Sequence, residues 1–236
     1  MASNLVRSQS DGPVTRITMD DGKVNAFSPD MLAALHEAFD QAERDRTAVL
    51  LTGRPGYFSA GFDLEVLRNG TLDDVQALLL LGATLAERIL SFPAPVVVAC
   101  SGHAFPAGAF LLLAADHRIG AQGPFKLGLN EVRIGLTLPW FATVLARYRL
   151  SPAHADHAGV TGTMFDPDGA LVAGLLDAVV PPEDLEATAR EAAADLAALD
   201  QQAHAATKSR MRRDVARDLR GAIESELTRA GSGATA

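Results

Sequence analysis

Two segments of the chain share one pattern, in which a short apolar run passes through a small-residue turn into a helix. The first, AVLLTGRPGYFSAGFDL, begins at Ala48, and the second, PVVVACSGHAFPAGAFLLLAAD, begins at Pro95. Apolar runs without alternation are typical of strands that are buried on both faces, as in parallel sheets. Since strands that alternate with helices are typical of α/β proteins, this repeated pattern predicts the α/β class.

The remainder of the chain continues the alternation of strands and helices. VTRITM (Val14–Met19) alternates apolar and polar residues like a half-buried strand, and Ser28-Pro29 is a helix start with proline at the first helical position. We also expect a helix over 72–90, a helix that ends at 115, and two helices that begin at 152 and at 167. Strands are expected over 96–100, 116–119 and 179–180. The chain after Glu183 is charged and Ala-rich, which predicts two or three helices. We therefore expect a core over 1–182 and a helical C-terminal region over 183–236.

Composition and charge exclude several classes of protein and site. The single cysteine, Cys100, rules out an intramolecular disulfide and disfavours a cysteine-based zinc site, so no metal is expected. A net charge of −8, from 21 Lys and Arg against 29 Asp and Glu, argues against nucleic acid as a partner. The N-terminal MASNLVRSQSDGPV lacks the apolar centre of a signal peptide, and no run has the length of a membrane span. We expect a cytoplasmic protein without a membrane partner.

The two strand-turn-helix segments are candidate binding sites for an anion or an oxyanion. Small residues let a ligand approach the backbone, and the N–H groups of a first helical turn are free to donate. Neither segment has the Gly-Lys-Ser/Thr of a P-loop, the G-x-G-x-x-G of a dinucleotide fold or the G-x-S-x-G of a hydrolase. The pattern by itself also fits ordinary loops that pack a helix tightly on a sheet.

Three motifs carry a resemblance to a known family. YFSAGFDL resembles the F-x-A-G-x-D-[LI] signature of the crotonase (enoyl-CoA hydratase/isomerase) superfamily, and SGHAFPAGAFLLLAADHRI and KLGLNEVRIGLTLP resemble its second and third signatures. They occur in the family's order and at about its spacing, and DDGKVNAFS and TKSRMR extend the similarity over most of the chain. The resemblance implies a spiral of β-β-α units with two roughly perpendicular sheets and a helical C-terminal extension. It also implies trimers or hexamers, in which the C-terminal region over 183–236 takes part in oligomerisation.

The resemblance also implies which residues bind an acyl-CoA thioester. The backbone N–H groups at Ala60 and Ala107 correspond to the family's oxyanion hole, although glycine is usual at the position of Ala107. No cofactor is implied, because coenzyme A enters as part of the substrate. Asp63 is also expected to cap its helix. The residues expected along coenzyme A are Lys23, Val24, Ala26, Phe58, Gly61, Asp63 and Leu64, and those expected around the acyl chain are Phe110, Leu136 and Trp140.

The family's acid–base residues point to one reaction more than to others. Hydratases of the family use two glutamates, and here Phe110 stands at the first position and Glu131 at the second. GLNE-x-x-x-G is similar to Δ3,Δ2-enoyl-CoA isomerases, so the resemblance implies that Glu131 moves a proton from C2 to C4 of a 3-enoyl-CoA. A carboxylate with this task benefits from a pKa raised by an apolar pocket, for which Leu129, Val132, Ile134 and Phe110 are candidates.

Two alternatives stay open at this point. A weak enoyl-CoA hydratase would need a second acid, which the three motifs do not contain. A non-catalytic acyl-CoA-binding protein of the same fold is compatible with Phe110 and Ala107, but it has no chemical need for Glu131. We expect His103 to be a packed loop histidine rather than a base, and Cys100 to be an inert buried thiol.

Overall fold

The centre of the molecule is a mixed sheet of six strands. A computed structural model describes residues 5–228 of the chain. The six strands lie in the order β1-β2-β4-β7-β9-β12, in which β1 and β2 form an antiparallel hairpin and every other neighbouring pair is parallel. The fully buried β4 and β7 are the two apolar runs of the sequence, so the prediction of a parallel α/β sheet is confirmed. The strands of this sheet are β1 (Val6–Asp11), β2 (Val14–Met19), β4 (Ala48–Thr52), β7 (Val96–Cys100), β9 (His117–Ala121) and β12 (Ala178–Val180).

Two small sheets lie beside the large one. A four-stranded sheet has the order β11-β10-β8-β5, and β3 pairs with β6. Strands β5, β6 and β8 lie in the two small-residue turns of the sequence, because strands of two to four residues are too short to show a period. Their bounds are β3 (Ala26–Phe27), β5 (Gly56–Ser59), β6 (Gly61–Phe62), β8 (Gly102–Ala104), β10 (Leu127–Gly128) and β11 (Met164–Phe165).

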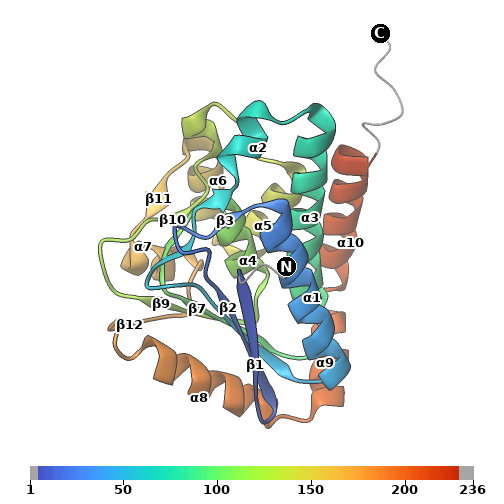
Figure 1. Ribbon diagram of the computed structural model, residues 1–236. Helices are drawn as coiled ribbons and strands as arrows, with labels where there is room; N and C mark the ends of the chain where they lie inside the picture. The colour runs from blue at the N-terminus through green and yellow to red at the C-terminus, as the bar shows by residue number, and fades with distance from the viewer. Residues whose placement is uncertain (1–4, 229–236) are drawn as a thin grey trace.

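Helices cover both faces of the large sheet (Figure 1). The larger apolar core lies between the sheet and α1, α3, α4, α5 and α10, and a smaller one lies under α8 on the opposite face. Within residues 5–228, no helix has the length and apolar character needed to cross a bilayer. The helices are α1 (Pro29–Asp45), α2 (Leu64–Asn69), α3 (Leu72–Ser91), α4 (Pro106–Ala114), the 3-10 helix η1 (Glu131–Ile134), α5 (Trp140–Arg149), α6 (Pro152–Thr161), α7 (Pro167–Ala173), α8 (Leu185–Ala197), α9 (Gln201–Met211), α10 (Arg213–Ile223) and the π-helical turn η2 (Glu224–Thr228).

The C-terminal helices pack onto the preceding part of the same chain. Helix α10 contacts α3 and α5, and its buried face, including Leu219 and Ile223, belongs to the larger core. Helix α8 closes the other face of the sheet through Leu185 and Ala189. Two or three helices were expected after residue 183, and α8, α9 and α10 are present there, whereas the domain boundary at residue 182 stays a prediction.

A buried ion network joins the C-terminal helices to the end of α4. Asp116, which follows α4, pairs with Lys208 (2.7 Å) and Arg212 (2.8 Å) and accepts a hydrogen bond from the Val96 N–H. The Arg212 guanidinium also donates to the carbonyl oxygens of Ala114 and Ala115 at the C-terminal end of α4. The position of α4 is thus fixed from its C-terminal end by charges from the C-terminal region.

Candidate active site

The three family motifs meet at one edge of the four-stranded sheet. Strand β8 pairs in parallel with β5 on one side and with β10 on the other. Because parallel strands end at the same edge, the segments that follow them lie side by side. These segments are 60–62 after β5, 105–108 after β8 and 129–131 after β10. The Phe105 N–H donates to the Ser59 carbonyl oxygen at 2.9 Å, which joins the first two segments directly.

The segment after β8 ends in the N-terminus of α4. Phe105 is the N-cap residue and offers no side-chain cap, and Pro106 occupies the first helical position. The first N–H groups of a helix have no acceptor within the helix, so those of Ala107 and Gly108 are available. Ala107 has a negative φ, and its methyl group is accommodated in the apolar core. The condition for a backbone donor at Ala107 is therefore met, although glycine is usual in the family at this position.

The segment after β5 offers a different donor from the one expected. The Ala60 N–H donates to the Val24 carbonyl oxygen at 2.9 Å, so Ala60 does not supply the free donor that its place in the motif implied. Phe62 lies opposite Phe27 in the parallel β3–β6 pair, and the Asp63 N–H donates to the Phe27 carbonyl oxygen. In such a pair a residue bonds to the two neighbours of the residue opposite, so the N–H of Phe62 points away from β3.

Glu131 is a buried carboxylate on η1, the short helix after β10. Only 6% of the residue is exposed, and neither carboxylate oxygen accepts a hydrogen bond from another residue within 5–228. Burial raises the pKa of the Glu131 carboxyl to about 7, and its own backbone N–H offsets part of that effect. A carboxyl group with this pKa is divided between its acid and base forms near neutral pH, as proton transfer requires.

The surroundings of Glu131 differ in part from the expected apolar pocket. Leu129 is buried beside it, as expected. Val132 and Ile134 are half-exposed, because the single turn of η1 that directs Glu131 inward directs them outward. The apolar environment of the carboxylate therefore comes from the core on its inner side and not from these two residues.

The three residues expected around the acyl chain do not line one pocket. Phe110 is buried in α4, where its ring packs edge-on against Phe141 (5.2 Å between centroids) and is tilted toward Phe62 (6.3 Å). Leu136 lines an open cavity of about 890 Å³ between η1, α5 and α6. Trp140 begins α5 with 64% of its surface exposed. Of the three, Phe110 is the one that lies in the core shared with the motif segments.

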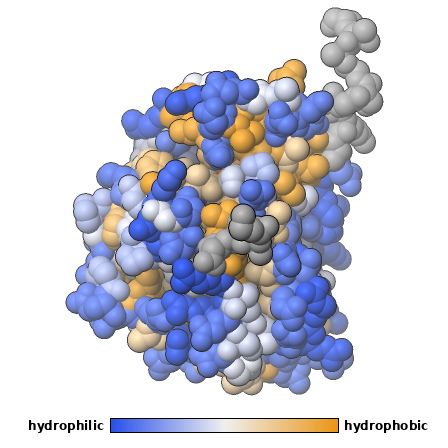
Figure 2. Space-filling view, viewed as in Figure 1, coloured by the Kyte–Doolittle hydropathy of each residue, from blue (hydrophilic) through white to orange (hydrophobic). Residues whose placement is uncertain are grey.

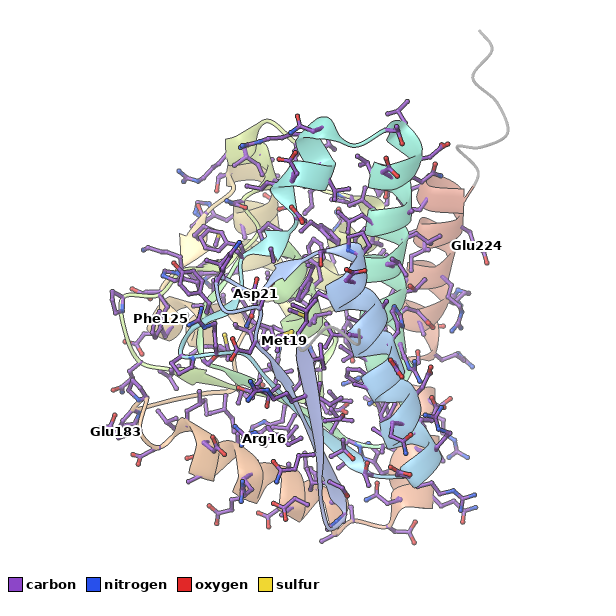
Figure 3. All side chains as sticks on the ribbon, in the orientation of Figure 1. Arg16, Met19, Asp21, Phe125, Glu183 and Glu224 are labelled. Atoms are coloured by element: carbon purple, nitrogen blue, oxygen red, sulfur yellow. The ribbon has the colours of Figure 1, made fainter. Side chains whose placement is uncertain are left out.

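The loop expected to bind coenzyme A is tied down by two residues that the sequence did not single out. Asp21, labelled in Figure 3, accepts hydrogen bonds from the backbone N–H groups of Lys23 (2.7 Å), Asn25 (2.9 Å) and Ala26 (3.2 Å). The buried Asn25 amide donates to carbonyl oxygens of the β2 and β5 strands. Asn25 has a φ of 54°, a left-handed conformation that asparagine tolerates better than most residues, which is the signal that could have identified it.

The other expected contacts with coenzyme A lie along the same loops. Lys23 and Leu64 are exposed, Val24 and Ala26 are half-buried, and Gly61 and Phe58 are buried. Figure 2 shows apolar surface over the region of α2 and α3, and Leu64 and Leu72, the first residues of these two helices, are exposed. The side chain of Asp63 accepts a hydrogen bond from the Glu65 N–H (2.9 Å), so its expected role as the cap of α2 is confirmed.

His103 and Cys100 have the expected structural character. His103 lies among the rings of Tyr57, Phe105 and Phe125, and its Nδ1 accepts a hydrogen bond from the Lys126 N–H. Burial lowers the pKa of His103, which favours the neutral ring. The Cys100 thiol is buried, and burial raises its pKa to about 12, so a reactive thiolate is disfavoured.

The fold and the site together define a crotonase-type α/β protein, in which turns after neighbouring parallel strands meet beside a buried carboxylate. Sequence comparison gives the family. The chain belongs to the enoyl-CoA hydratase/isomerase family, whose sequence model matches residues 9–232.

Individual relatives share most of the chain and differ in their reactions. A solved enoyl-CoA hydratase/isomerase family protein from Pseudomonas syringae has a TM-score of 0.93 and 45% identity, with 97% of this chain and 99% of that chain covered. Human mitochondrial enoyl-CoA delta isomerase 1 is 29% identical, with 91% of this chain and 72% of the relative covered. Carnitinyl-CoA dehydratase of Salmonella typhi is 32% identical, with 78% and 71% covered. The relatives therefore do not define which of the family's reactions this chain catalyses.

Proposed function

We propose that this protein is an enoyl-CoA isomerase that converts a 3-enoyl-CoA into the 2-trans-enoyl-CoA. The observation that carries the proposal is the isolated Glu131 carboxylate, buried and without a hydrogen-bond partner among residues 5–228. Phe110, at the position where hydratases have their other glutamate, is packed against Phe141 and has no proton to exchange. One carboxylate is sufficient to move a proton between two carbons, whereas hydration in this family uses two.

The reaction requires one proton to leave and one to return. The Glu131 carboxylate removes a proton from C2, and the electron pair of the C–H bond moves toward the thioester carbonyl to give a conjugated enolate. The protonated Glu131 then donates a proton to C4, the C3–C4 double bond is lost and a C2–C3 double bond forms. No electron acceptor is needed, which is why the proposal includes no cofactor besides the coenzyme A of the substrate.

The negative charge on the enolate oxygen needs hydrogen-bond donors. We assign this role to the backbone N–H groups of Phe62 and Ala107, in place of the expected pair Ala60 and Ala107. The engaged Ala60 N–H and the direction of the Phe62 N–H support this assignment. Removal of one such donor costs about 3–4 kcal/mol of transition-state stabilisation in known cases.

The substrate class in this proposal is an acyl-CoA thioester, held along the loop that Asp21 and Asn25 tie down. The exposed Lys23 lies on this loop, where its ammonium group is available to a phosphate of coenzyme A. Backbone groups of Val24 and Ala26 and the exposed side chain of Leu64 complete the proposed binding surface.

We also propose a homo-oligomer, a trimer or hexamer. Val132, Leu136 and Val160 are exposed apolar residues that line the open cavity of about 890 Å³, and Trp140 is exposed close to it in the chain. A monomer gains nothing from this exposed apolar surface, whereas a second copy of the chain would bury it.

The proposal is tested by offering the purified protein 3-enoyl-CoA thioesters of short and long chains. Formation of the conjugated 2-enoyl thioester, followed in the ultraviolet, is the expected result. In parallel, a 2-enoyl-CoA is offered and loss of conjugation is followed, and we expect hydration to be absent or far slower. Hydration as fast as isomerisation would contradict the proposal, and tight acyl-CoA binding with neither reaction would indicate a binding protein.

A further inference from the structure

Gly82, on the long helix α3, is a buried glycine, and another residue occupies the space that a side chain at this position would need. A Cβ atom built on Gly82 would lie 2.4 Å from Cε1 and 2.6 Å from Cζ of Phe62. Real Cβ atoms do not come this close to other heavy atoms, so any side chain at position 82 would have to displace the Phe62 ring. Since glycine in a helix interior costs roughly 1 kcal/mol relative to alanine, this position needs a compensating reason.

The Phe62 ring is held between two helices. Gly82 of α3 lies on one side, and the Phe110 ring of α4 is tilted against it with 6.3 Å between centroids. Helix α4 is the element whose first turn carries the Ala107 N–H. The contacts of the Phe62 ring therefore fix the position of β6 relative to both helices.

The residue on the N-terminal side of Phe62 is a glycine in a left-handed backbone conformation. The preceding Gly61 has a φ of 90°, and the ideal Cβ position on Gly61 is 3.7 Å from the Ala107 nitrogen. Glycine changes its backbone angles at low cost. A push on the Phe62 ring is therefore expected to rotate the adjoining peptide group, which carries the Phe62 N–H.

We infer that Gly82 is a positioning residue, which seats the Phe62 ring and thereby directs the Phe62 N–H at the thioester oxygen. This inference rests on the proposed function, since it concerns one of the two donors proposed for the enolate. It assigns to a residue outside the three motifs a role in the oxyanion hole, through packing alone.

The test is the substitution Gly82→Ala with a matched control. We expect Gly82→Ala to lower kcat about 10- to 100-fold, because misdirecting one donor acts on the transition state, and to leave KM within about threefold. Gly221→Ala is the control: Gly221 is also a helical glycine, but, its own helix backbone and chain neighbours aside, no atom lies within 4 Å of its ideal Cβ, and kcat should not change.

A second substitution separates positioning from general damage to the fold. Leucine at position 62 lacks the Cε1 and Cζ atoms that the new methyl group would meet, but it keeps the backbone N–H. In the Phe62→Leu background, Gly82→Ala should therefore change kcat by less than about twofold. An equal loss in both backgrounds, or full activity of Gly82→Ala with Phe62 present, would overturn the inference.

A spectroscopic readout keeps the inference independent of turnover. The infrared stretch of the thioester carbonyl in a bound, saturated acyl-CoA reports how strongly donors polarise it. We expect a shift to lower frequency on binding to the wild-type protein, a smaller shift in Gly82→Ala, and no further decrease when Gly82→Ala is added to Phe62→Leu. A wild-type shift without isomerisation would count against the proposed reaction alone, and an unchanged shift in Gly82→Ala would count against the role of Gly82 alone.

If Gly82→Ala does not fold, Phe62→Ala provides the same information. That substitution keeps the N–H and removes the ring that Gly82 seats. A smaller carbonyl shift than in the wild-type protein is expected, whereas an unchanged shift would show that the ring does not direct the N–H.

Discussion

The chemistry of Glu131 follows from the length of the element that carries it. A 3-10 helix of one turn, Glu131–Ile134, is long enough to direct one side chain into the core and the next ones outward. Neutralising the buried carboxylate requires a proton rather than a counter-ion, since no other residue within 5–228 donates a hydrogen bond or a charge to it. The same isolation that makes the group costly to ionise makes it able to give and take a proton near neutral pH.

This isolation predicts how the reaction depends on pH. Burial raises the pKa of Glu131 to about 7, and the base that removes the C2 proton is the deprotonated form. Below that pKa, kcat/KM should therefore fall about tenfold per pH unit, and above it kcat/KM should level off. The measurement is kcat/KM for a 3-enoyl-CoA between pH 5 and 9.

A titrating histidine is the main alternative explanation for a midpoint near pH 7 in kcat/KM. His103 lies in the second motif, at the start of the turn before α4, and burial lowers its pKa. In His103→Gln the midpoint should stay at its wild-type position, because that ring has a structural role. A midpoint below about 5, which is typical of an exposed glutamate, would contradict the buried state of Glu131.

At the scale of elements, helix α4 connects the site with the C-terminal region. Its N-terminus carries the Ala107 N–H, and its C-terminal carbonyl groups accept hydrogen bonds from Arg149 and Arg212. Cations at the C-terminal end of a helix oppose the partial negative charge there. The orientation of the proposed oxyanion hole thus depends on a residue far along the chain, since Arg212 donates to the carbonyl oxygen of Ala114, 98 residues before it.

Removing the Arg212 charge should destabilise the protein strongly. Arg212→Met breaks the pair with Asp116 and leaves three carbonyl groups without this donor. We expect the free energy of unfolding to fall by about 3 kcal/mol, because breaking a buried ion pair costs roughly that much or more. Urea unfolding at a fixed protein concentration measures it. The adjacent Arg213 is exposed, so Arg213→Met should change the free energy by less than about 0.5 kcal/mol, and equal effects of the two substitutions would contradict this account.

The sequence predicted elements well where a pattern had room to repeat. The buried strands β4 and β7 and the helix begun by Ser28-Pro29 appear as expected, and the Ser28 hydroxyl accepts the hydrogen bond of a helix cap. Strands such as β10, with two residues, owe their existence to neighbours that are distant in sequence, and no local signal specifies them.

The candidate site was predictable in its segments and less so in its atoms. The motifs located Glu131 and Ala107. Which N–H of 60–63 is free depends on the pairing of β3 with β6, and the outward direction of Val132 depends on a 3-10 turn, so neither could be obtained from residue types. The contact between the Phe62 ring and Gly82 joins residues 20 positions apart in sequence, and Gly82 lies on a helix that no motif includes.

At the scale of the whole molecule, the exposed apolar groove predicts self-association. Val160→Asp places a charge in the cavity between η1, α5 and α6, where a second copy is proposed to bind. Sedimentation velocity should show a trimer or hexamer for the wild-type protein and smaller species for Val160→Asp. Leu72→Asp, at an exposed apolar residue outside this cavity, is the control that should leave assembly unchanged.

The single tryptophan gives an independent signal for the same assembly. Trp140 is 64% exposed in one chain, so its emission should shift to longer wavelength when the oligomer dissociates on dilution. A wild-type protein that sediments as a monomer with unchanged emission at all concentrations would contradict the proposed oligomer.

The measurement that most directly tests the central claim compares Glu131→Gln with the wild-type protein in turnover and in binding. Glutamine has nearly the shape of glutamate but cannot accept a proton at working pH. We predict that isomerisation of a 3-enoyl-CoA falls by about 10³-fold or more, while the Kd of a saturated acyl-CoA, measured by calorimetry, changes little. Isomerisation that persists in Glu131→Gln at a rate near that of the wild-type protein would contradict the assignment of Glu131 as the single acid–base residue.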